Sequence, residues 1–547
     1  MSKKVTINQR VGEFAAGTSL FEIGESLDVS VPSSCRKQGK CRECLMEITE
    51  GMDSLTPPSE EENHLKDNFR LSCCARLTDV PGEVQAHTMR RAEIHIEDQA
   101  MNLPPEAALQ SIDPAVTRDG DRVLLDGQQI ATSTGRLIGL AIDIGTTTVV
   151  VRALDLESGE IVASTSLENP QRFGGTDVMS RIQFDTDHPG RLLQRTLLGY
   201  LNRAIKELPF EAECIFEIVV AGNPTMRDLF LGYDVSSIGQ RPYRSLSEKA
   251  WRDGEADTTA ISMPARKLRL PCHPEARLYA MPVVSGHVGG DAAACLLAVA
   301  ADRSDELVAI MDIGTNTEVF MGYRDKLLAA SCPAGPAFEG RAISQGMPGL
   351  DGAIEKVHLP DSGPPEISVI GDKAPEGICG SGLISLLAEL KRTEQMNAFG
   401  RFEDGESSFV VNEEHGIKFL ESDINELAQA KGANVAGIRI VAQAYGRSLA
   451  DVDKFYLAGG FGRHLDIDAA KGIGLIPDLP TEKIVQIGNA AIEGACLALL
   501  SVTRRRELEE RVKTIQHVEL ETDPNFFDHF VEGCQFQPYG IEPGDLD

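Results

Sequence analysis

Five cysteines crowd the first hundred residues of this 547-residue chain, and the spacing of four of them is typical of iron ligands. Cys35, Cys41 and Cys44 stand close together, and Cys73 follows about thirty residues later. Four thiolates can hold two irons, with a short loop wrapping the cluster and a distant fourth ligand closing it. Zinc is the alternative, although zinc sites usually use paired short spacings. The pattern therefore predicts a [2Fe-2S] cluster.

The choice of the fourth ligand rests on a resemblance. The cysteine spacing resembles that of the ferredoxin family in which five residues separate the first two cysteines. In that family a β-grasp fold carries the cluster, and the ligand follows an Arg-Leu-Ser or Arg-Leu-Ala triplet. Here Arg70-Leu71-Ser72 precedes Cys73 and Cys74, so the resemblance implies Cys73 as the ligand and leaves Cys74 without an assigned role.

A second group of chemically competent residues occurs twice. The segment AIDIGTTT at 141–148 reappears as IMDIGTNT at 310–317, each time after an apolar run typical of a strand. A glycine followed by hydroxyl side chains allows N–H and O–H donors to approach phosphate oxygens, and the preceding aspartate can hold hydrated Mg²⁺ or orient water. Two copies indicate two similar half-domains that close on a nucleotide, whereas a single copy would also fit an ordinary structural turn.

A third glycine turn, YLAGGFG at 456–462, follows another strand-like run and could admit a flat adenosine against the backbone. The three segments together resemble the phosphate and adenosine motifs of the acetate and sugar kinase, Hsp70 and actin superfamily. The resemblance implies Asp143 and Asp312 as the Mg²⁺ and water residues. It implies phosphate contacts at Gly145, Thr146, Thr147, Thr148, Gly314, Thr315, Asn316 and Thr317, and adenosine contacts at Gly459, Gly460 and Gly462. Glu339, in the segment GPAFEG, is a further candidate at the cleft, with helix capping as the alternative.

Shorter segments make the resemblance specific to one family within this superfamily. They are NPQ at 169–171, AGNPTM at 221–226, AGPAFEG at 334–340, GICGSG at 377–382 and GNAA at 488–491. With the cysteine domain, they resemble the ferredoxin-fused reductive activators of corrinoid proteins over nearly the whole chain. That family uses ATP to return an oxidised Co(II) corrinoid to Co(I). The resemblance implies a corrinoid protein of a methyltransferase system as partner, an electron donor that the sequence does not name, and a homodimer.

The expected architecture is multidomain. An α+β ferredoxin-like domain of the β-grasp type would span 1–95, with strand-like runs at 4–7, 45–48 and 82–86 and a helix near 19–26. Residues 96–136 are expected to form a linker with one short strand pair at most. From residue 137 onward, strand-like runs alternate with helical stretches, for example at 189–207 and 436–449, which predicts an α/β actin-like fold. Its expected division is a middle domain at 137–205 and an ATP-binding domain at 206–547.

The composition limits the kinds of partner that the protein is expected to bind. The net charge of −30 and the isoelectric point near 4.8 argue against nucleic acid, because phosphate binding needs a basic surface. The chain contains no apolar run near the ~20 residues of a membrane span, and its first residues lack the apolar core of a signal peptide. A cytoplasmic protein without membrane contact is expected. The seven remaining cysteines stand singly among apolar neighbours and are expected to be structural.

Three other functions remain open on the motifs alone. A metabolite kinase would explain the paired phosphate motifs but would leave the iron–sulfur cluster without a task. An activator of a radical dehydratase couples the same fold to electron transfer, but in that family no ferredoxin domain precedes the ATPase. A chaperone-like interaction module would bind ATP without redox chemistry.

Overall fold

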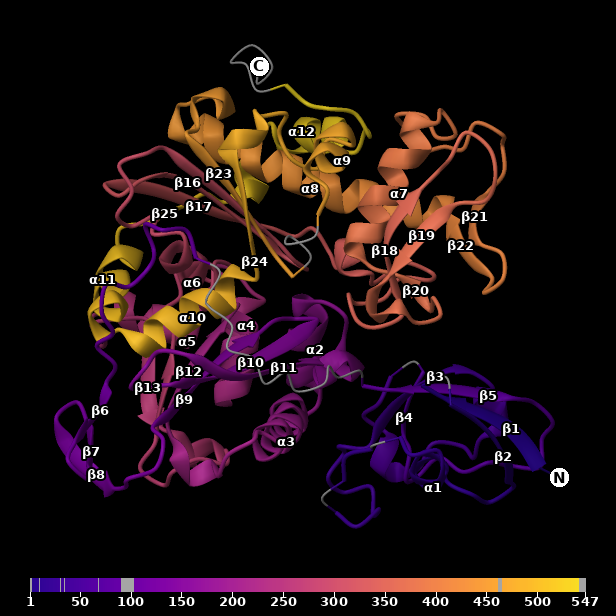
Figure 1. The fold of residues 1–547 in the computed structure, drawn as a ribbon, viewed down its shortest axis with the longest axis horizontal. Helices are drawn as coiled ribbons and strands as arrows, with labels where there is room; N and C mark the ends of the chain where they lie inside the picture. The colour runs from indigo at the N-terminus through magenta and orange to yellow at the C-terminus, as the bar shows by residue number, and fades with distance from the viewer. Residues whose placement is uncertain are drawn as a thin grey trace.

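The N-terminal domain is a five-stranded sheet with one helix against it, the arrangement expected of a β-grasp fold (Figure 1). The computed structural model describes residues 2–8, 10–29, 31–33, 35–66, 68–89, 103–460 and 465–540. The strand order is β2-β1-β5-β3-β4. The elements are β1 (Ser2–Ile7), β2 (Arg10–Ala15), α1 (Leu20–Ser26), β3 (Leu45–Glu50), β4 (Phe69–Leu71) and β5 (Val84–Thr88). Ser19 and Glu22 form a reciprocal capping box that begins α1 at the predicted position.

A small sheet occupies the segment that was expected to be mostly linker. Strands β6 (Val116–Asp119), β7 (Arg122–Leu125) and β8 (Gln128–Thr132) form an antiparallel three-stranded meander, so the expectation of one strand pair at most was wrong. Its turns lie at two Asp-Gly dipeptides, and Gly120, Asp126 and Gly127 have positive φ, which is typical of tight hairpins. Residues 90–102 of the expected linker lie outside the described residues.

The remainder of the chain contains two six-stranded sheets whose central strands are paired in the same way (Figure 1). In the first sheet the order is β11-β10-β9-β12-β14-β13, and in the second it is β24-β23-β15-β16-β17-β25. The central strands β9 and β15 each pair antiparallel with the following strand and parallel with a later one. The equivalent positions confirm that the repeated sequence motif marks two similar halves, because each copy ends one of these central strands.

The first sheet and its helices comprise β9 (Ile138–Ile144), β10 (Thr148–Asp155), β11 (Ile161–Glu168), α2 (Val178–Asp187), α3 (Leu192–Lys206), β12 (Ile215–Gly222), α4 (Pro224–Leu231), α5 (Leu246–Arg252), β13 (Ile261–Pro264), β14 (Arg277–Ala280) and α6 (Gly290–Ala298). Strand β12 pairs with β9 along its length. The expected domain division near residue 205 therefore falls within one continuous sheet.

The second half comprises β15 (Val308–Ile313), β16 (Thr317–Tyr323), β17 (Lys326–Cys332), β18 (Ala353–His358), β19 (Glu366–Val369), β20 (Gly377–Ile378), α7 (Gly380–Arg392), β21 (Ser408–Asn412), β22 (Ile417–Leu420), α8 (Glu421–Tyr445), β23 (Lys454–Ala458), α9 (Ile467–Gly472), β24 (Ile484–Gly488), α10 (Ala490–Leu500), α11 (Val502–Val512), β25 (Gln516–His517) and α12 (Phe526–Gly533). Strands β18 to β20 and the hairpin β21–β22 form two smaller sheets beside α7. Helix α8 differs from the helix expected at 436–449, because it begins earlier and ends where Gly446 adopts a left-handed conformation.

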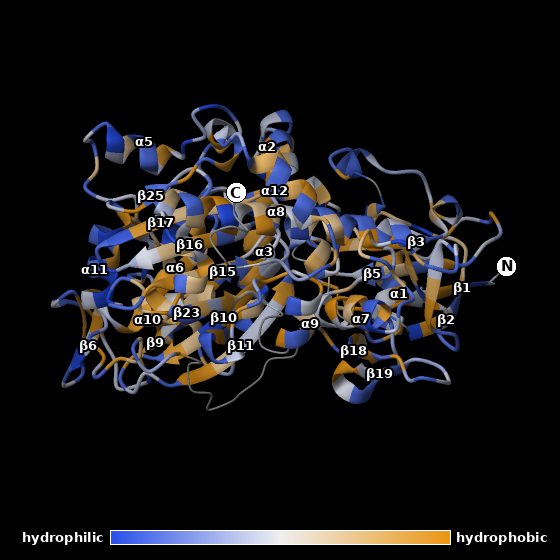
Figure 2. Ribbon diagram, turned by 90° about the horizontal axis from the view of Figure 1, so that it is seen from above, coloured by the Kyte–Doolittle hydropathy of each residue, from blue (hydrophilic) through white to orange (hydrophobic). Residues whose placement is uncertain are grey.

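One hydrophobic core joins the two halves. It contains Ala141 and Val219 of the first sheet, Ile310 and Phe320 of the second, and nearly all of the apolar residues of α6 and α10. Hydrophobic residues concentrate on the sheets and on these helices, whereas α5 and α11 are mostly hydrophilic (Figure 2). Among the described residues, no helix combines the length and the hydrophobicity that crossing a membrane requires.

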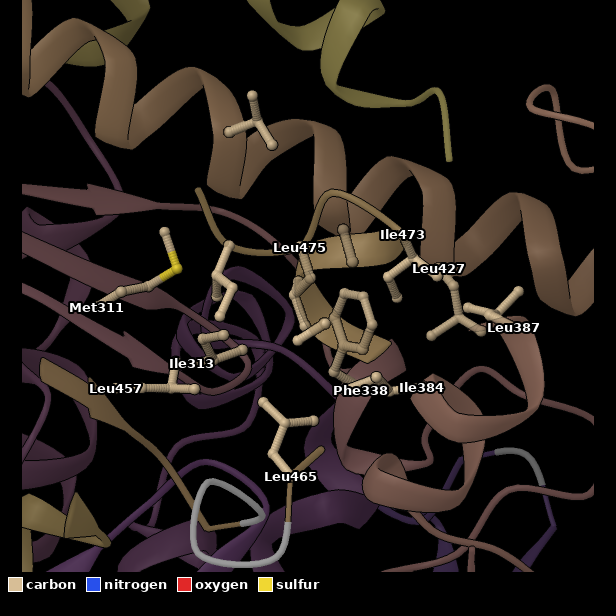
Figure 3. Packing of buried hydrophobic residues seen from close by; sticks show 14 of the residues in the cluster. Met311, Ile313, Phe338, Ile384, Leu387, Leu427, Leu457, Leu465, Ile473 and Leu475 are labelled. Carbon is tan, nitrogen blue, oxygen red and sulfur yellow. The ribbon is translucent and has the colours of Figure 1, made fainter. Parts of the chain in front are cut away.

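A second core anchors the strands that carry the repeated motif and the third glycine turn. Met311 and Ile313 of β15 and Leu457 of β23 point into the same buried region as Phe338 and Leu427 (Figure 3). Because these side chains are fully buried, the turns that follow them are held on a rigid base.

Candidate functional site

The four predicted iron ligands lie as two pairs of thiols. The Sγ atoms of Cys44 and Cys73 are 3.3 Å apart and buried. Cys35 and Cys41 are half-buried, and the Cys41 thiol and backbone both hydrogen-bond to the Cys35 sulfur. The strands β3 and β4 bring Cys44 and Cys73 together, because Leu45 pairs with Leu71. The structure thus joins residues about thirty positions apart, as the spacing predicted.

The surroundings shift the thiol pKa values in opposite directions: they lower those of Cys35 and Cys44 and raise those of Cys73 and Cys74. Burial raises the pKa of Cys35, but backbone N–H groups of Cys41, Gln38 and Lys40 and the Cys41 thiol donate to it, so the pKa is lowered overall. The hydrogen bond between the Cys44 and Cys73 thiols is the main cause that lowers the pKa of Cys44 to about 7 and raises that of Cys73. Iron and zinc both bind thiolates, and the residues present fit such a metal group.

The pairing fits a binuclear cluster. Two irons ligated by four thiolates take two thiolates each, and the pairs Cys35 with Cys41 and Cys44 with Cys73 could supply them.

Cys74 lies beside the candidate ligands without replacing one. Its Sγ is 3.8 Å from that of Cys73, and burial raises its pKa. The 3.3 Å contact of Cys44 is with Cys73, which favours Cys73 as the fourth ligand.

The two copies of the repeated motif meet at one carboxylate. The Thr147 hydroxyl donates to Glu339 Oε2 at 2.8 Å, and the Thr315 hydroxyl donates to the same oxygen. The two hydroxyl oxygens are 3.1 Å apart. Residues 168 positions apart in sequence therefore form one polar centre, with Glu339 between them. Glu339 begins no α-helix, so the capping alternative does not describe its contacts.

Each motif turns tightly at its glycine. The backbone N–H of Gly145 donates to Thr148 O at 3.0 Å, which closes the first turn. Gly314 and Asn316 lie at the equivalent turn of the second motif and are half-buried. Thr146 accepts a hydrogen bond from the Asn223 side-chain amide at 3.0 Å. These contacts place the first hydroxyls of each motif at the ends of β9 and β15.

Not every predicted phosphate residue joins this centre. Thr148 and Thr317 begin the strands β10 and β16. The Thr317 hydroxyl is buried without a hydrogen-bond partner. Thr148 pairs with Glu168 in the β10–β11 ladder. The structure therefore brings together Thr147, Thr315 and Glu339 but places these two threonines in the sheets.

Acidic residues surround the polar centre and hold one another in a less ionised state. Burial is the main cause that raises the pKa of Asp143 to about 7 and of Asp312 to about 6, and nearby carboxylates add to it. Burial likewise raises the pKa of Asp291 to about 7 and that of Glu339. A divalent cation would relieve this repulsion, so the donor set fits Mg²⁺, which binds few carboxylates and keeps several waters.

Several of these neighbours were missed by sequence reasoning. The Asn489 amide donates to Asp143 Oδ2 at 2.8 Å, and the Cys295 thiol donates to Asp312 Oδ2 at 2.9 Å. The fully buried Arg181 donates to Thr146 O at 2.7 Å. Nothing local marked Cys295 or Arg181, because their partners are distant in sequence.

The third glycine turn abuts the second motif. Gly459 has φ of +121°, and a Cβ there would lie 2.3 Å from Ile313 O, so only glycine fits. Its N–H donates to Gly488 O at 2.9 Å. Around Gly460 an added Cβ would meet no atom of the described residues within 4 Å. Gly462 lies outside the described residues.

Comparisons with known families cover most of the chain. Residues 5–78 match the 2Fe-2S iron-sulfur cluster binding domain. Residues 138–304 match the RACo middle region, and residues 306–544 match the C-terminal domain of RACo, the ASKHA domain. The expected multidomain fold class, with a ferredoxin domain preceding an actin-like domain, is confirmed.

Individual proteins agree with these matches. Corrinoid activation enzyme RamQ of Eubacterium limosum is 32% identical over 430 residues, which are 73% of this chain and 70% of that protein. The Co(II) methylated amine-specific corrinoid protein reductase of Methanosarcina barkeri is 24% identical over 431 residues, 74% of this chain and 78% of that protein. The 2Fe-2S ferredoxin of Escherichia coli K12 is 29% identical over 92 residues, 15% of this chain and 83% of that protein.

A solved structure matches almost the entire fold. The reductive activator for corrinoid, iron-sulfur protein superposes with a TM-score of 0.73 at 28% identity, covering 99% of this chain and 100% of that chain. The cysteine pairs, the doubled phosphate motif and these relatives lead to one assignment. The chain belongs to the family of reductive activators of corrinoid proteins that carry an N-terminal [2Fe-2S] ferredoxin domain.

Proposed function

We propose that this chain binds and hydrolyses ATP to drive one electron from its [2Fe-2S] cluster to the Co(II) corrinoid of a partner protein, which restores Co(I). The observation that carries the proposal is the meeting of both phosphate motifs at Glu339, in a chain that also carries two cysteine pairs fit for two irons. An ATPase centre and an electron carrier on one chain have a joint purpose only if the nucleotide assists the transfer.

The nucleotide would bind between the two halves. Thr147 and Thr315 offer hydroxyl donors 3.1 Å apart to the phosphates, with N–H groups of the glycine turns beside them. Asp143 and Asp312 would hold Mg²⁺, directly or through water, and Mg²⁺ when bound neutralises developing phosphate charge. Glu339 would orient the attacking water once phosphate oxygens take over the threonine hydroxyls. Gly459 and Gly460 would lie against the adenosine.

The four cysteines would hold the cluster in two pairs, Cys35 with Cys41 and Cys44 with Cys73. When bound, a [2Fe-2S] cluster supplies one-electron redox chemistry near about −400 mV. The half-buried Cys35 and Cys41 place one side of this site nearer to solvent than Cys44 and Cys73. The electron donor would reach the cluster most readily on that side.

The free energy of the electron transfer gives a reason for the nucleotide. For a one-electron transfer, each deficit of about 59 mV lowers the equilibrium constant tenfold, which is roughly 1.4 kcal/mol. A deficit of a few hundred millivolts therefore stalls the transfer. Nucleotide binding can oppose it by favouring a complex in which the cobalt has lost or changed a ligand, because a ligand shifts an equilibrium by its differential affinity.

The partner assignment follows the relatives. Their names describe corrinoid activation and reduction of a Co(II) corrinoid protein, which supports a corrinoid protein of a methyltransferase system as the partner here. A homodimer, a cytoplasmic location and a separate protein donor that reduces the cluster belong to the same proposal.

The test is anaerobic. The protein with its cluster reconstituted is mixed with a reductant, Mg-ATP and candidate Co(II) corrinoid proteins, and the cobalt absorption is followed. We expect loss of the Co(II) bands, or methyl-Co(III) when a methyl donor is present. Transfer of phosphate from ATP to a small molecule, with no change at cobalt for any candidate, would favour a kinase instead.

A further inference from the structure

The cluster domain, within residues 2–89, packs through an apolar face against the helices α2 and α3 and the short helix that follows β11. Cys44, Leu45, Phe69 and Cys73 belong to the same buried core as residues of β9 to β11 and of the helices α2 to α4. Two of the proposed iron ligands are thus covered by the docking. The face includes a short 3-10 helix, η3 (Pro170–Gly174), whose Phe173 ring meets the His64 ring edge-on with centroids 5.6 Å apart.

Polar contacts align the docked domain. The Tyr200 hydroxyl of α3 donates to Glu43 O at 2.7 Å, directly beside Cys44. Arg172 of η3 donates to both carboxylate oxygens of Glu47 on β3, at 3.1 and 3.3 Å, and its guanidinium carbon lies 5.4 Å from the Phe69 ring. Arg172 is therefore one of the polar contacts that fix the position of the cluster domain.

Arg172 belongs to an ionic chain that runs from the cluster domain into the nucleotide site. Glu168 at the end of β11 forms ion pairs with both Arg172 and Arg341. All three side chains are shielded from water, with 3% exposure for Glu168, 11% for Arg172 and 14% for Arg341. In such surroundings each charge depends on its partner, because solvent does not compensate for a lost one.

The helix η3 and the ionic chain each connect to the phosphate motifs. Arg341 stands two residues after Glu339, and its charge lowers the pKa of Glu339 against the effect of burial. Asn169 caps η3 and donates from its backbone to Thr147 O at 2.7 Å and from its side chain to Gly145 O at 2.8 Å. A change at Thr147 thus reaches Arg172 by two routes.

We propose that nucleotide phosphates at Thr147 and Thr315 loosen the docking of the cluster domain through the chain Glu339, Arg341, Glu168, Arg172 and Glu47. The inference rests on the proposed function. Phosphate oxygens take over the two threonine hydroxyls, so Glu339 loses its donors and draws Arg341 away from Glu168. Glu168 then holds Arg172 more strongly, and Glu47 loses its ionic partner and keeps the hydrogen bond from the Asn68 amide. Release uncovers the Cys44 and Cys73 side of the site for an electron acceptor.

Hydrogen exchange with mass spectrometry tests this on the full-length, cluster-loaded protein. We expect Mg-ATP to raise the exchange rate in peptides covering residues 43–50 by about tenfold. An increase of that size is expected if the loss of one ion pair makes the opening of the docked domain easier. Glu47→Gln and Arg172→Gln should show the fast exchange without nucleotide and gain little more with it. Their double variant should not exceed the larger single effect, because both remove one pair.

The matched control is Glu50→Gln, the same change on the same strand at an exposed position that contacts Gln85. It should retain the full response to Mg-ATP. Calorimetry of ATP binding separates the possible failures. If ATP binds the wild-type protein but exchange at 43–50 stays constant or slows, the inference is wrong and the proposed function stands. If ATP does not bind, the proposed function fails and takes the inference with it.

Discussion

The acidic residues near the phosphate motifs make the nucleotide site costly to fold without a cation. The pKa of Asp143 rises to about 7 against an ordinary value of 3.8, mainly because the side chain is buried. A carboxyl with a raised pKa holds a proton in the folded state that the unfolded chain has already lost. Its ionisation therefore lowers stability as the pH rises from about 4 to about 7, and the loss is complete above that range.

We predict that Asp143→Asn stabilises the protein without nucleotide at pH 8, by on the order of 2 kcal/mol. The gain should shrink toward zero as the pH falls to about 4, because the wild-type carboxyl is then neutral. Thermal unfolding at a series of pH values measures this as a difference of a few degrees. A gain that is independent of pH would mean that ionisation of Asp143 does not cause it.

The cysteine assignment makes a prediction at the same scale. Cys73→Ser should lose the cluster, while Cys74→Ser should retain about two irons and two sulfides per chain, because a [2Fe-2S] centre needs four thiolates. Iron and sulfide analysis of anaerobically purified protein checks this. The reverse result, with Cys74 essential and Cys73 dispensable, would exchange their roles.

At the residue scale, the sequence was informative where a motif is local. The Asp-x-Gly-Thr segments identified Thr147 and Thr315, and the Arg-Leu-Ser triplet pointed to Cys73. The Cys295 thiol and the Arg181 guanidinium reach the site from helices whose packing no local pattern reports. Their roles could be found only once the sheets were assembled.

At the scale of elements, α6 and α10 pack tightly enough to hold the two halves together. A Cβ at Gly494 of α10 would lie 2.0 Å from the carbonyl oxygen of Ala294 in α6. The same helices begin near Asp291 and Asn489, and the Asn489 amide donates to Asp143 of the proposed nucleotide site. Their separation therefore governs the site as well as the core.

We predict that Gly494→Ala destabilises the protein by about 2–4 kcal/mol and weakens ATP binding, because the backbones must move apart. Gly472→Ala, at the end of α9 where an added Cβ meets no atom within 4 Å, is the control and should be close to neutral. Thermal unfolding and calorimetry compare the two variants. Equal stability of both would contradict the close approach of α6 and α10.

Element prediction succeeded where periodicity and turns were both visible, as for α1 and the strands β9 and β15. It failed for β6 to β8, although the two Asp-Gly turns in that segment were available signals. It also shortened α8 at its N-terminal end, although residues 421–430 alternate buried and exposed positions with a helical period.

In the whole molecule, the proposed electron supply and the proposed nucleotide chemistry lie in separate domains. We predict that Asp312→Asn stops ATP hydrolysis but leaves the cluster spectrum unchanged, because the cysteine pairs belong to a separate sheet. Cys41→Ser should abolish the cluster signal while ATP still binds. Absorption spectra and phosphate release distinguish these two outcomes. A variant of either kind that lost both properties would show that the two sites fold as one unit.

The most direct test of the central claim is the extent of cobalt reduction at one fixed donor potential, measured with Mg-ATP, with Mg-ADP and without nucleotide. We predict that the Co(II) absorption of the partner corrinoid disappears only with Mg-ATP, and that both Asp312→Asn and Cys41→Ser prevent this. Reduction at the same rate and to the same extent without nucleotide would contradict it. The N-terminal domain would then act as an ordinary ferredoxin, and ATP would not drive the transfer.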